Sequence, residues 1–303
     1  MLLIYTPKKG TIPAGTYCGQ LKFLVAFVMM IGKEIEPMRI KIITAVLVTA
    51  AILVFCSLLV RSTQNKATAP QSPPTLNALT KEEAGQGWIL LFDGKNINNW
   101  RGLGIGGVPK MHWFIEGRAI KKVPTKDVPR QADGQPFVGG DLMTIETFED
   151  FELAFDWKIS PAGNSGVKYN VSEELSLANA PNRAALGFEY QILDDDKNAD
   201  AKNGPNRTAA ALYDLIAPTN KKLKPVGEYN TAKIVFKGGH GEHWLNGLKV
   251  LEYDLGTPRM NELLAKSKYK NIPNFAQKRK GHIVLQDHTD AVWYRNIKIR
   301  KIK

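Results

Sequence analysis

Three clusters of polar residues combine side chains used in acid–base chemistry or in sugar binding. The first begins with Glu189 and Gln191 and ends in an acidic run that starts at Asp194. Glu189 and Gln191 are two residues apart in a predicted strand, so both side chains leave one face, about 7 Å apart. A carboxylate and an amide on one face suit sugar hydroxyls. The alternative is an exposed strand face followed by a solvated acidic loop.

The second cluster is His240-Gly241-Glu242-His243-Trp244. His and Glu are metal ligands, but strand alternation places His243 on the opposite face from Glu242, which favours an ordinary hairpin over joint coordination. Trp244 is suited either to stacking on a sugar ring or to packing in the core.

The third cluster is Gln286-Asp287-His288, at the end of a predicted strand. An Asp beside a His can orient the imidazole for general acid–base catalysis. The alternative is turn formation, because Asp often caps its own turn. The stretch from Gly163 to Gly166 also allows two interpretations: it brings backbone close to a ligand, or it closes a hairpin.

Alternating hydrophobic residues predict the strands that must position these clusters. Thr80 and Glu83 have capping-box spacing, which predicts a short helix at the start of the domain. Asn246-Gly247 predicts a tight hairpin turn. We expect a short helix at residues 261–266 and a solvated, Lys-rich surface loop within residues 259–280. Many short strands with few helices predict an all-β sandwich or jelly roll. The predicted strands are 151–159, 187–193, 232–236, 243–245, 248–253, 282–286 and 292–299.

Composition and missing motifs exclude several classes of protein. The 303 residues carry a net charge of +12, but residues 1–79 supply half of it, so no nucleic-acid partner is expected. Both cysteines, Cys18 and Cys56, lie in the N-terminal region, so the body has no cysteine-based zinc site, nucleophile or disulfide. The sequence lacks G-x-S-x-G, Walker and H-E-x-x-H motifs. The E-x-D-x-x-E pattern of laminarinase-type sandwich glycosidases is also missing.

The N-terminal part predicts export. Residues 1–37 are an uncertain extension, and residues 38–61 are a membrane anchor or signal segment whose uncharged run covers residues 42–60. Alternatives are a signal cleaved after Ala69 and a lipoprotein attached through Cys56. Each places the following domain in the periplasm or at the cell surface, and the anchor would tether it to the membrane. Residues 62–79 form a Pro-rich linker, and residues 80–303 form the sandwich.

A series of short motifs resembles the 3-keto-disaccharide hydrolase domain family. Phe188 departs from the family's usual pattern, where proline is more frequent. The motifs are Gly87-Trp88, Leu91-Phe92-Asp93-Gly94-Lys95, Asn99-Trp100, Gly140-Asp141-Leu142, Asp150-Phe151-Glu152-Leu153, Gly163-Asn164-Ser165-Gly166, Glu189-Tyr190-Gln191-Ile192-Leu193-Asp194, Ala211-Leu212-Tyr213-Asp214, Glu242-His243-Trp244-Leu245-Asn246-Gly247, Leu285-Gln286-Asp287-His288 and Trp293-Tyr294-Arg295-Asn296-Ile297.

The resemblance implies a concanavalin-like jelly roll that cleaves glycosides already oxidised to a ketone at C3. A base would remove the C2 proton, the C1 substituent would be eliminated, and water would add to the product. No cofactor is required by the sequence, although a divalent metal is compatible with such chemistry. The competing hypothesis is a noncatalytic, tethered carbohydrate-binding module.

On this hypothesis the resembling motifs supply the site residues. Glu189 or His288 is the base, and Asp287 orients His288. His243 is the acid or a ligand. The residues expected to bind the sugar are Gln191, Asn164, Asp194, Tyr213 and Gln286.

Overall fold

The computed structural model describes residues 75–302, apart from residues 136, 181–182 and 278. The described residues form one compact unit. The predicted extension, the predicted anchor and the linker up to residue 74 lie outside the described residues. No helix within the described part of the chain is long and apolar enough to cross a membrane.

Short strands dominate the described residues, as the sequence predicts. The strands are β1 (Ile89–Leu90), β2 (Trp100–Gly102), β3 (Trp113–Glu116), β4 (Ala119–Lys122), β5 (Leu142–Thr144), β6 (Phe151–Ile159), β7 (Asn164–Val171), β8 (Phe188–Leu193), β9 (Asn230–Lys237), β10 (His240–Leu245), β11 (Leu248–Asp254), β12 (His282–Leu285) and β13 (Val292–Lys301). The α-helices are α3 (Lys81–Gly85), α4 (Glu173–Asn179) and α5 (Pro258–Lys266), and the 3₁₀ helices are η1 (Thr125–Asp127), η2 (Ala199–Asn203) and η3 (Pro205–Arg207).

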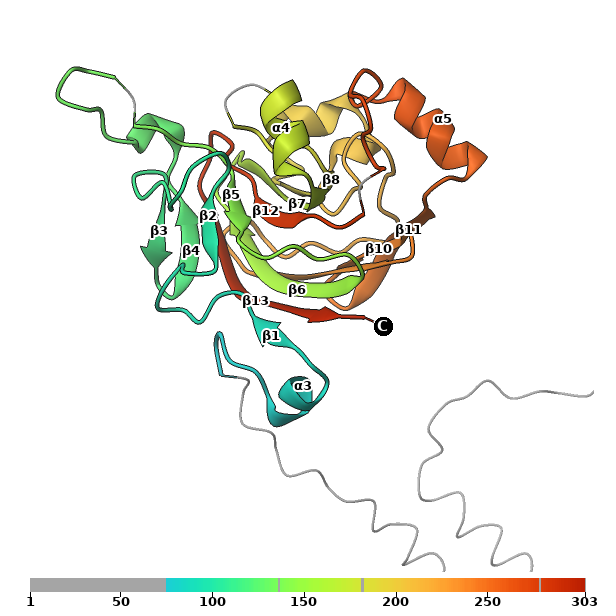
Figure 1. Ribbon diagram of the computed structural model, residues 1–303, viewed down its shortest axis with the longest axis horizontal. Helices are drawn as coiled ribbons and strands as arrows, with labels where there is room; N and C mark the ends of the chain where they lie inside the picture. The colour runs from blue at the N-terminus through green and yellow to red at the C-terminus, as the bar shows by residue number, and fades with distance from the viewer. Residues whose placement is uncertain (1–74, 136, 181–182, 278, 303) are drawn as a thin grey trace, which may run out of the picture. The chain divides into compact units, whose positions relative to one another are not determined.

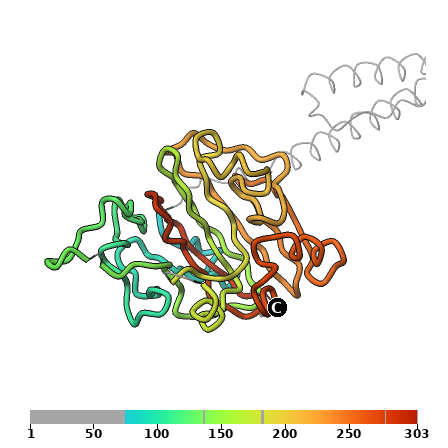
Figure 2. Tube along the Cα trace, turned by 90° about the horizontal axis from the view of Figure 1, so that it is seen from above, coloured from blue at the N-terminus to red at the C-terminus, as the bar shows by residue number. Residues whose placement is uncertain are grey.

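The strands form two antiparallel sheets, one above the other in Figure 1. Sheet A has the order β11-β10-β9-β6-β13-β4-β3, with β1 paired to β13, and sheet B has the order β2-β5-β12-β7-β8. In Figure 2 the red segment that contains β12 runs beside the yellow-green segment that contains β7, although the two are far apart in the sequence. This arrangement confirms the predicted jelly-roll sandwich.

The hydrophobic core fills the space between the sheets. In β6 every second residue is buried, which places Phe155 and Trp157 on the inner face of sheet A. Phe155 packs edge-on against Tyr190 of sheet B, with ring centroids 5.6 Å apart. Burying an aromatic ring of this size contributes about 1.5–3 kcal/mol relative to an exposed one. These contacts hold sheet B at a fixed position over sheet A.

Sheet B is buried on both faces at β7 and β8. Every residue of these two strands is buried, because α4 and long loops cover the outer face of the sheet (Figure 1). Strand β7 is not among the predicted strands, although Val167, Tyr169 and Val171 alternate with polar or small residues along it. Of the two interpretations of residues 163–166, the hairpin is wrong, because β6 and β7 belong to different sheets. Gly163 lies in the connection from β6 in sheet A to β7 in sheet B.

Three local predictions are confirmed. The Thr80 and Glu83 capping box is formed at the start of α3. Asn246 and Gly247 join β10 to β11 with positive φ angles of 48° and 83°. The predicted short helix is α5, which begins at Pro258, three residues earlier than expected.

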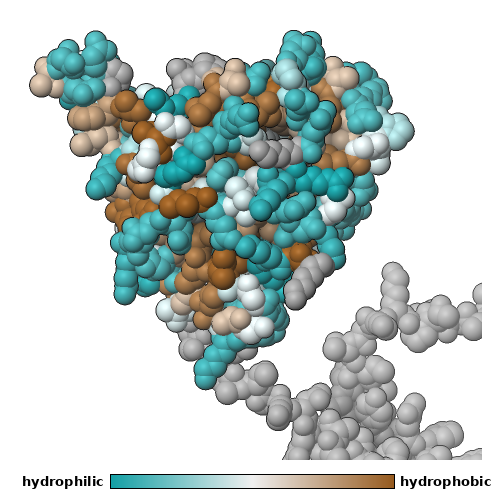
Figure 3. Space-filling model, viewed as in Figure 1, coloured by the Kyte–Doolittle hydropathy of each residue, from teal (hydrophilic) through white to brown (hydrophobic). Residues whose placement is uncertain are grey.

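The outer surface is mixed in character. Figure 3 shows hydrophilic side chains over much of the visible face, with hydrophobic patches between them. Large hydrophobic side chains that are exposed include Phe114 and Leu248 in sheet A and Leu177 in α4. Scattered exposure of this kind is normal for a folded domain.

Candidate active site

The outer face of sheet B carries the polar residues that the sequence placed together. In β8, Tyr190 and its alternate neighbours point into the core, so Glu189 and Gln191 point outward. Across the strand pair, Lys168 of β7 lies opposite Glu189, and Gly166 lies opposite Gln191. Directly opposite residues share a face, so these four positions form one surface, which is called the Glu189 surface below.

Glu189 is a buried carboxylate with an unused acceptor. The residue is 2% exposed, and its Oε2 atom accepts no hydrogen bond from any described residue. Lys268 Nζ lies 3.5 Å from Oε2. The absence of a side chain at Gly166 makes room for the carboxylate, because a Cβ there would lie 2.6 Å from Glu189 Oε1. Any larger residue at this position would displace Glu189.

Three other buried oxygen atoms near Glu189 also have no hydrogen-bond partner among the described residues. They are Gln191 Oε1, Gln286 Oε1 and the Tyr269 hydroxyl. Gln286 follows β12, and its N–H donates to Gly166 O, which places it next to the Glu189 surface. An unpaired buried polar group costs about 1–3 kcal/mol. Four such atoms in one region indicate a surface that is completed by a ligand.

A buried ion pair lies beneath this surface. Lys168 Nζ contacts Asp141 Oδ2 at 3.2 Å and donates to Ala185 O at 3.0 Å. Burial alone would lower the pKa of Lys168, but the attraction of Asp141 and Glu189 outweighs it, and the pKa is raised. Asp141 also accepts the N–H groups of Ala185 and Asp287, each at 2.7 Å. This network fixes the positive charge of Lys168 beside Glu189.

Tyr213 forms part of the same surface from the loop after η3. Its hydroxyl donates to Asp200 Oδ2 at 2.8 Å and accepts from Arg207 at 3.2 Å. Burial and the hydrogen bond to Asp200 raise the pKa of Tyr213, so the phenol stays protonated. Lys268 Nζ lies 3.9 Å from the centre of the Tyr213 ring. Tyr213 therefore offers a ring face rather than a free hydroxyl.

Asn164 lies at the start of β7, beside Gln191. Its side-chain oxygen is 3.5 Å from Gln191 Nε2, and its backbone N–H donates to Asp290. The structure thus brings together five of the residues that the sequence assigned to the site: Glu189, Gln191, Asn164, Tyr213 and Gln286.

His243 lies elsewhere, which corrects its predicted place in the site. The residue is 0% exposed and projects into the core between Tyr169 and Tyr190. Its Nε2 is 2.9 Å from the Tyr169 hydroxyl and its Nδ1 is 3.1 Å from Ala210 O. Burial lowers the pKa of His243 to about 4. With both ring nitrogens engaged in the core, it reaches neither a substrate nor a metal on the outer face.

Asp287 does not orient His288, which corrects a second prediction. Its carboxylate contacts His112 Nδ1 at 3.0 Å and Lys122 Nζ at 2.9 Å, and it accepts the N–H of Gly140. Burial would raise the pKa of Asp287, but His112 and Lys122 lower it overall. His288 is exposed, and its Nδ1 lies 3.3 Å from Thr289. The distant partner His112 had no local signal in the sequence.

Asp194 caps a turn and does not face the Glu189 surface. Its carboxylate accepts the N–H groups of Ala162, Asp196 and Lys197 at 2.7, 3.2 and 3.3 Å. The predicted substrate-binding role of Asp194 is therefore replaced by a role in holding the loop after β8.

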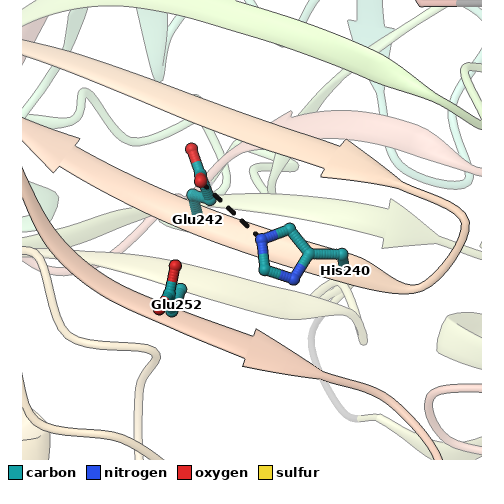
Figure 4. Close-up of side chains that lie close together, drawn as sticks. All are labelled: His240, Glu242 and Glu252. Carbon is teal, nitrogen blue, oxygen red and sulfur yellow. Dashed lines mark ion pairs between the residues drawn. The ribbon is translucent and has the colours of Figure 1, made fainter.

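His240 and Glu242 of the β10 cluster lie on the outer face of sheet A, in the hairpin that the sequence favours over a metal site. Figure 4 shows His240, Glu242 and Glu252, whose ligand atoms lie within 4.8 Å of one another. Lys249 Nζ contacts Glu242 at 3.1 Å and Glu252 at 2.5 Å, and His240 Nδ1 bonds to Asp254. Lys249 is already paired with both carboxylates, so this arrangement favours a surface ion-pair network over a metal centre.

A hollow in the surface lies away from Glu189. It has a volume of about 420 Å³ and is lined by α4 residues such as Glu174 and Leu175 together with Asn274 and Gln277. None of its lining residues belongs to the Glu189 surface. Size alone does not identify a site, and the unpaired oxygens favour the Glu189 surface.

Residues 87–300 match the family model described as the 3-keto-alpha-glucoside-1,2-lyase-like domain. The chain belongs to this family. A relative named 3-keto-disaccharide hydrolase, from Bacteroides thetaiotaomicron, is 39% identical over 231 residues, which cover 71% of this chain and 78% of the relative. The family match spans every residue of the Glu189 surface.

Two solved structures that are similar to this chain have the same fold. A putative glycosyl hydrolase from Parabacteroides distasonis is 29% identical with a TM-score of 0.65, covering 76% of this chain and 100% of that one. A second putative glycosyl hydrolase from the same organism is 27% identical with a TM-score of 0.51, covering 71% of this chain and 99% of the other. Both agree with the jelly-roll sandwich described above.

Proposed function

We propose that this domain cleaves the glycosidic bond of glycosides oxidised to a ketone at C3, with Glu189 as the base. The family and the name of the Bacteroides relative support the substrate class. The observation that carries the proposal is the buried Oε2 of Glu189, which accepts no hydrogen bond from a described residue and has the ammonium of Lys268 3.5 Å away. A carboxylate in that state is ready to accept a proton from a bound substrate.

The chemistry needs few groups because the ketone acidifies the adjacent carbon. Glu189 takes the proton from C2, the electron pair of the C2–H bond forms a C2=C3 double bond, and the π pair of the C3 carbonyl moves to its oxygen to give the enolate. The enolate collapses, the C1–O bond breaks, and its electron pair leaves with the aglycone oxygen. The protonated Glu189 returns its proton to that oxygen. Water then adds at C1 of the enone and C2 is reprotonated, so the net reaction is hydrolysis.

The neighbouring unpaired oxygens explain how the sugar would be held. Gln191 Oε1 and Gln286 Oε1 are acceptors without donors among the described residues, and sugar hydroxyls are donors. Asn164 extends this polar row along β7, and the Tyr213 ring provides an apolar wall. Sugar hydroxyls that donate to these oxygens would recover part of the free energy that is lost by burying the oxygens without partners. This recovery favours substrate binding.

His288 is the second candidate base from the sequence. It is exposed, and the neighbouring carboxylate of Asp287 contacts His112 instead of His288. We therefore assign the base to Glu189 and expect His288→Ala to retain more than half of the activity.

The test is release of p-nitrophenol from p-nitrophenyl 3-keto-glucoside by the full chain. We expect Glu189→Gln to lose about 10²–10⁴-fold in kcat, the usual contribution of a general base. Glu242→Gln is the matched control on sheet A and should behave like the wild type. Equal rates for Glu189→Gln and the wild type, in folded protein, would refute the assignment.

Two further arms separate other mechanisms. Release that is lost with EDTA and restored by a divalent metal would contradict a reaction run by side chains alone. Binding of unmodified glycans by the wild type, with no release from any 3-keto-glycoside, would favour the noncatalytic binding module. We expect release to persist in EDTA.

A further inference from the structure

Lys268 is a cation on the Glu189 surface that the sequence placed in a solvated loop. It lies just after α5, and its Nζ is 3.5 Å from Glu189 Oε2. The same atom lies 3.9 Å from the ring centre of Tyr213 and 5.0 Å from that of Tyr269. The side chain is 42% exposed, so it contacts both the buried carboxylate and the outside. Lys268 thus lies between Glu189 and the solvent from which a substrate would enter.

The backbone of Lys268 is held in place by a chain of hydrogen bonds. Its N–H donates to Asp214 Oδ2 at 2.6 Å. Arg207 in turn donates to Asp214 Oδ1 from Nε and Nη2, at 3.2 and 2.8 Å. Asp214 adopts a positive φ of 60°, an uncommon backbone conformation for a residue with a side chain. The surrounding structure therefore fixes where the ammonium group projects.

We propose that Lys268 is a further catalytic residue, whose ammonium binds the C3 carbonyl oxygen and stabilises the enolate as Glu189 removes the C2 proton. This inference rests on the proposed function. C2 and the carbonyl oxygen on C3 are separated by one C–C and one C=O bond, or about 2.4 Å. A base and a cation that serve these two atoms must be close neighbours, as Glu189 and Lys268 are.

Lys168 is less suited to this role. Two of its donor hydrogens are directed at Asp141 and Ala185 O, and the residue is buried in the sheet. Lys268 instead projects from a loop, and burial of its ammonium lowers its pKa even though Glu189 opposes the shift. A more acidic ammonium is a stronger hydrogen-bond donor to a developing oxyanion. Lys168 then serves to balance the charge of Glu189.

Proton transfer can be measured without cleavage of the glycosidic bond. The probe is 3-keto-1,5-anhydroglucitol, which has no aglycone, and the readout is exchange of its C2 hydrogen in D₂O by NMR. We expect Lys268→Met to slow exchange and kcat for aglycone release by about 10²–10³-fold, as the loss of an oxyanion donor does, with a smaller change in KM. Lys268→Arg should restore at least a tenth of the rate. Lys270→Met, two residues away, should match the wild type.

The outcomes distinguish the two proposals. A wild type that neither exchanges C2–H nor releases aglycone refutes the proposed function itself. A wild type that does both, with Lys268→Met unchanged, refutes only the role of Lys268. A pH profile whose acidic limb moves in Lys268→Met, with an unchanged plateau, would reduce Lys268 to a counter-ion of Glu189. A covalent substrate adduct on Lys268 after treatment with cyanoborohydride would replace the ammonium role with an imine.

Discussion

On the outer face of sheet A, Lys249 contacts both Glu242 and Glu252, and His240 bonds to Asp254. On the outer face of sheet B, Glu189 Oε2 accepts no hydrogen bond from a described residue, and neither does Gln191 Oε1. Both faces carry carboxylates, lysines and aromatic rings. They differ in burial, since His240 is 40% exposed whereas Glu189 is 2% exposed.

The difference shows which polar cluster is suited to chemistry. Exposed charges that are paired with each other gain little from a ligand, because water and salt already screen them. Buried acceptors that lack donors gain much more, because a ligand hydroxyl replaces a missing hydrogen bond. By residue type alone, the β10 hairpin with its two histidines and the β8 strand with Glu189 are equally good candidates for a functional site. The burial of the side chains and the number of their hydrogen-bond partners distinguish the two candidates.

The largest expected difference in stability concerns the ion pairs of the two faces. Asp141→Asn would leave Lys168 buried without its partner, and we expect a loss of about 3–5 kcal/mol in the free energy of unfolding. Glu242→Gln on sheet A should cost about 0.2–1 kcal/mol, because its pair with Lys249 is partly exposed. Urea unfolding of the two variants measures both values. Similar losses would show that the two faces do not differ as described.

The two histidines of β10 provide a comparison across a single strand. His243→Leu leaves Ala210 O without its partner in the core, and we expect a loss of about 1–3 kcal/mol. His240→Leu on the outer face should change stability by less than about 0.5 kcal/mol. Thermal unfolding checks both. The kcat of folded His243→Leu should equal that of the wild type, and a large fall in kcat would return His243 to the list of catalytic candidates.

Removing the side-chain amide of Gln191 should impair binding at little cost to stability. Gln191→Leu deletes the unpaired Oε1 at a position that is 0% exposed, together with the long hydrogen bonds of Nε2 to Asn164 and Arg207. The two effects oppose each other, so we expect stability to change by less than about 1 kcal/mol. The KM for a 3-keto-glycoside should rise about tenfold, as the loss of one useful hydrogen bond predicts. Glu242→Leu should do the opposite, with lower stability and an unchanged KM. A destabilised Gln191→Leu variant would mean that Gln191 supports the fold.

The smallest effect concerns the pH dependence of stability on sheet A. The hydrogen bond to Asp254 raises the pKa of His240 above its usual 6.5, against the effect of burial. The contribution of protonated His240 to the free energy of unfolding is therefore fully present below pH 6.5, and it is lost as the pH rises through the raised pKa. Solvent screening limits it to a few tenths of a kcal/mol. Unfolding at pH 5.5 and pH 8.5 should show this difference in the wild type and not in His240→Ala.

Local patterns predicted much of sheet A and little of sheet B. The alternation in β6 and the turn at Asn246-Gly247 depend on one buried face and on backbone preference, so the sequence reveals both. Strand β7 alternates as well, with Val167, Tyr169 and Val171 toward the core and polar or small residues between them, although the covering loops bury both of its faces.

The sequence alone determined that Glu189 and Gln191 share one face, because the period of a strand is two. It also determined the sandwich class, and the family motifs placed Asn164, Tyr213 and Gln286 near the site. Only the tertiary structure decided the long-range partners. His112 reaches Asp287 across 175 residues, and Lys268 reaches Glu189 from the loop after α5. These contacts follow from strand order and loop packing, which bring together residues whose separation in sequence carries no periodic signal.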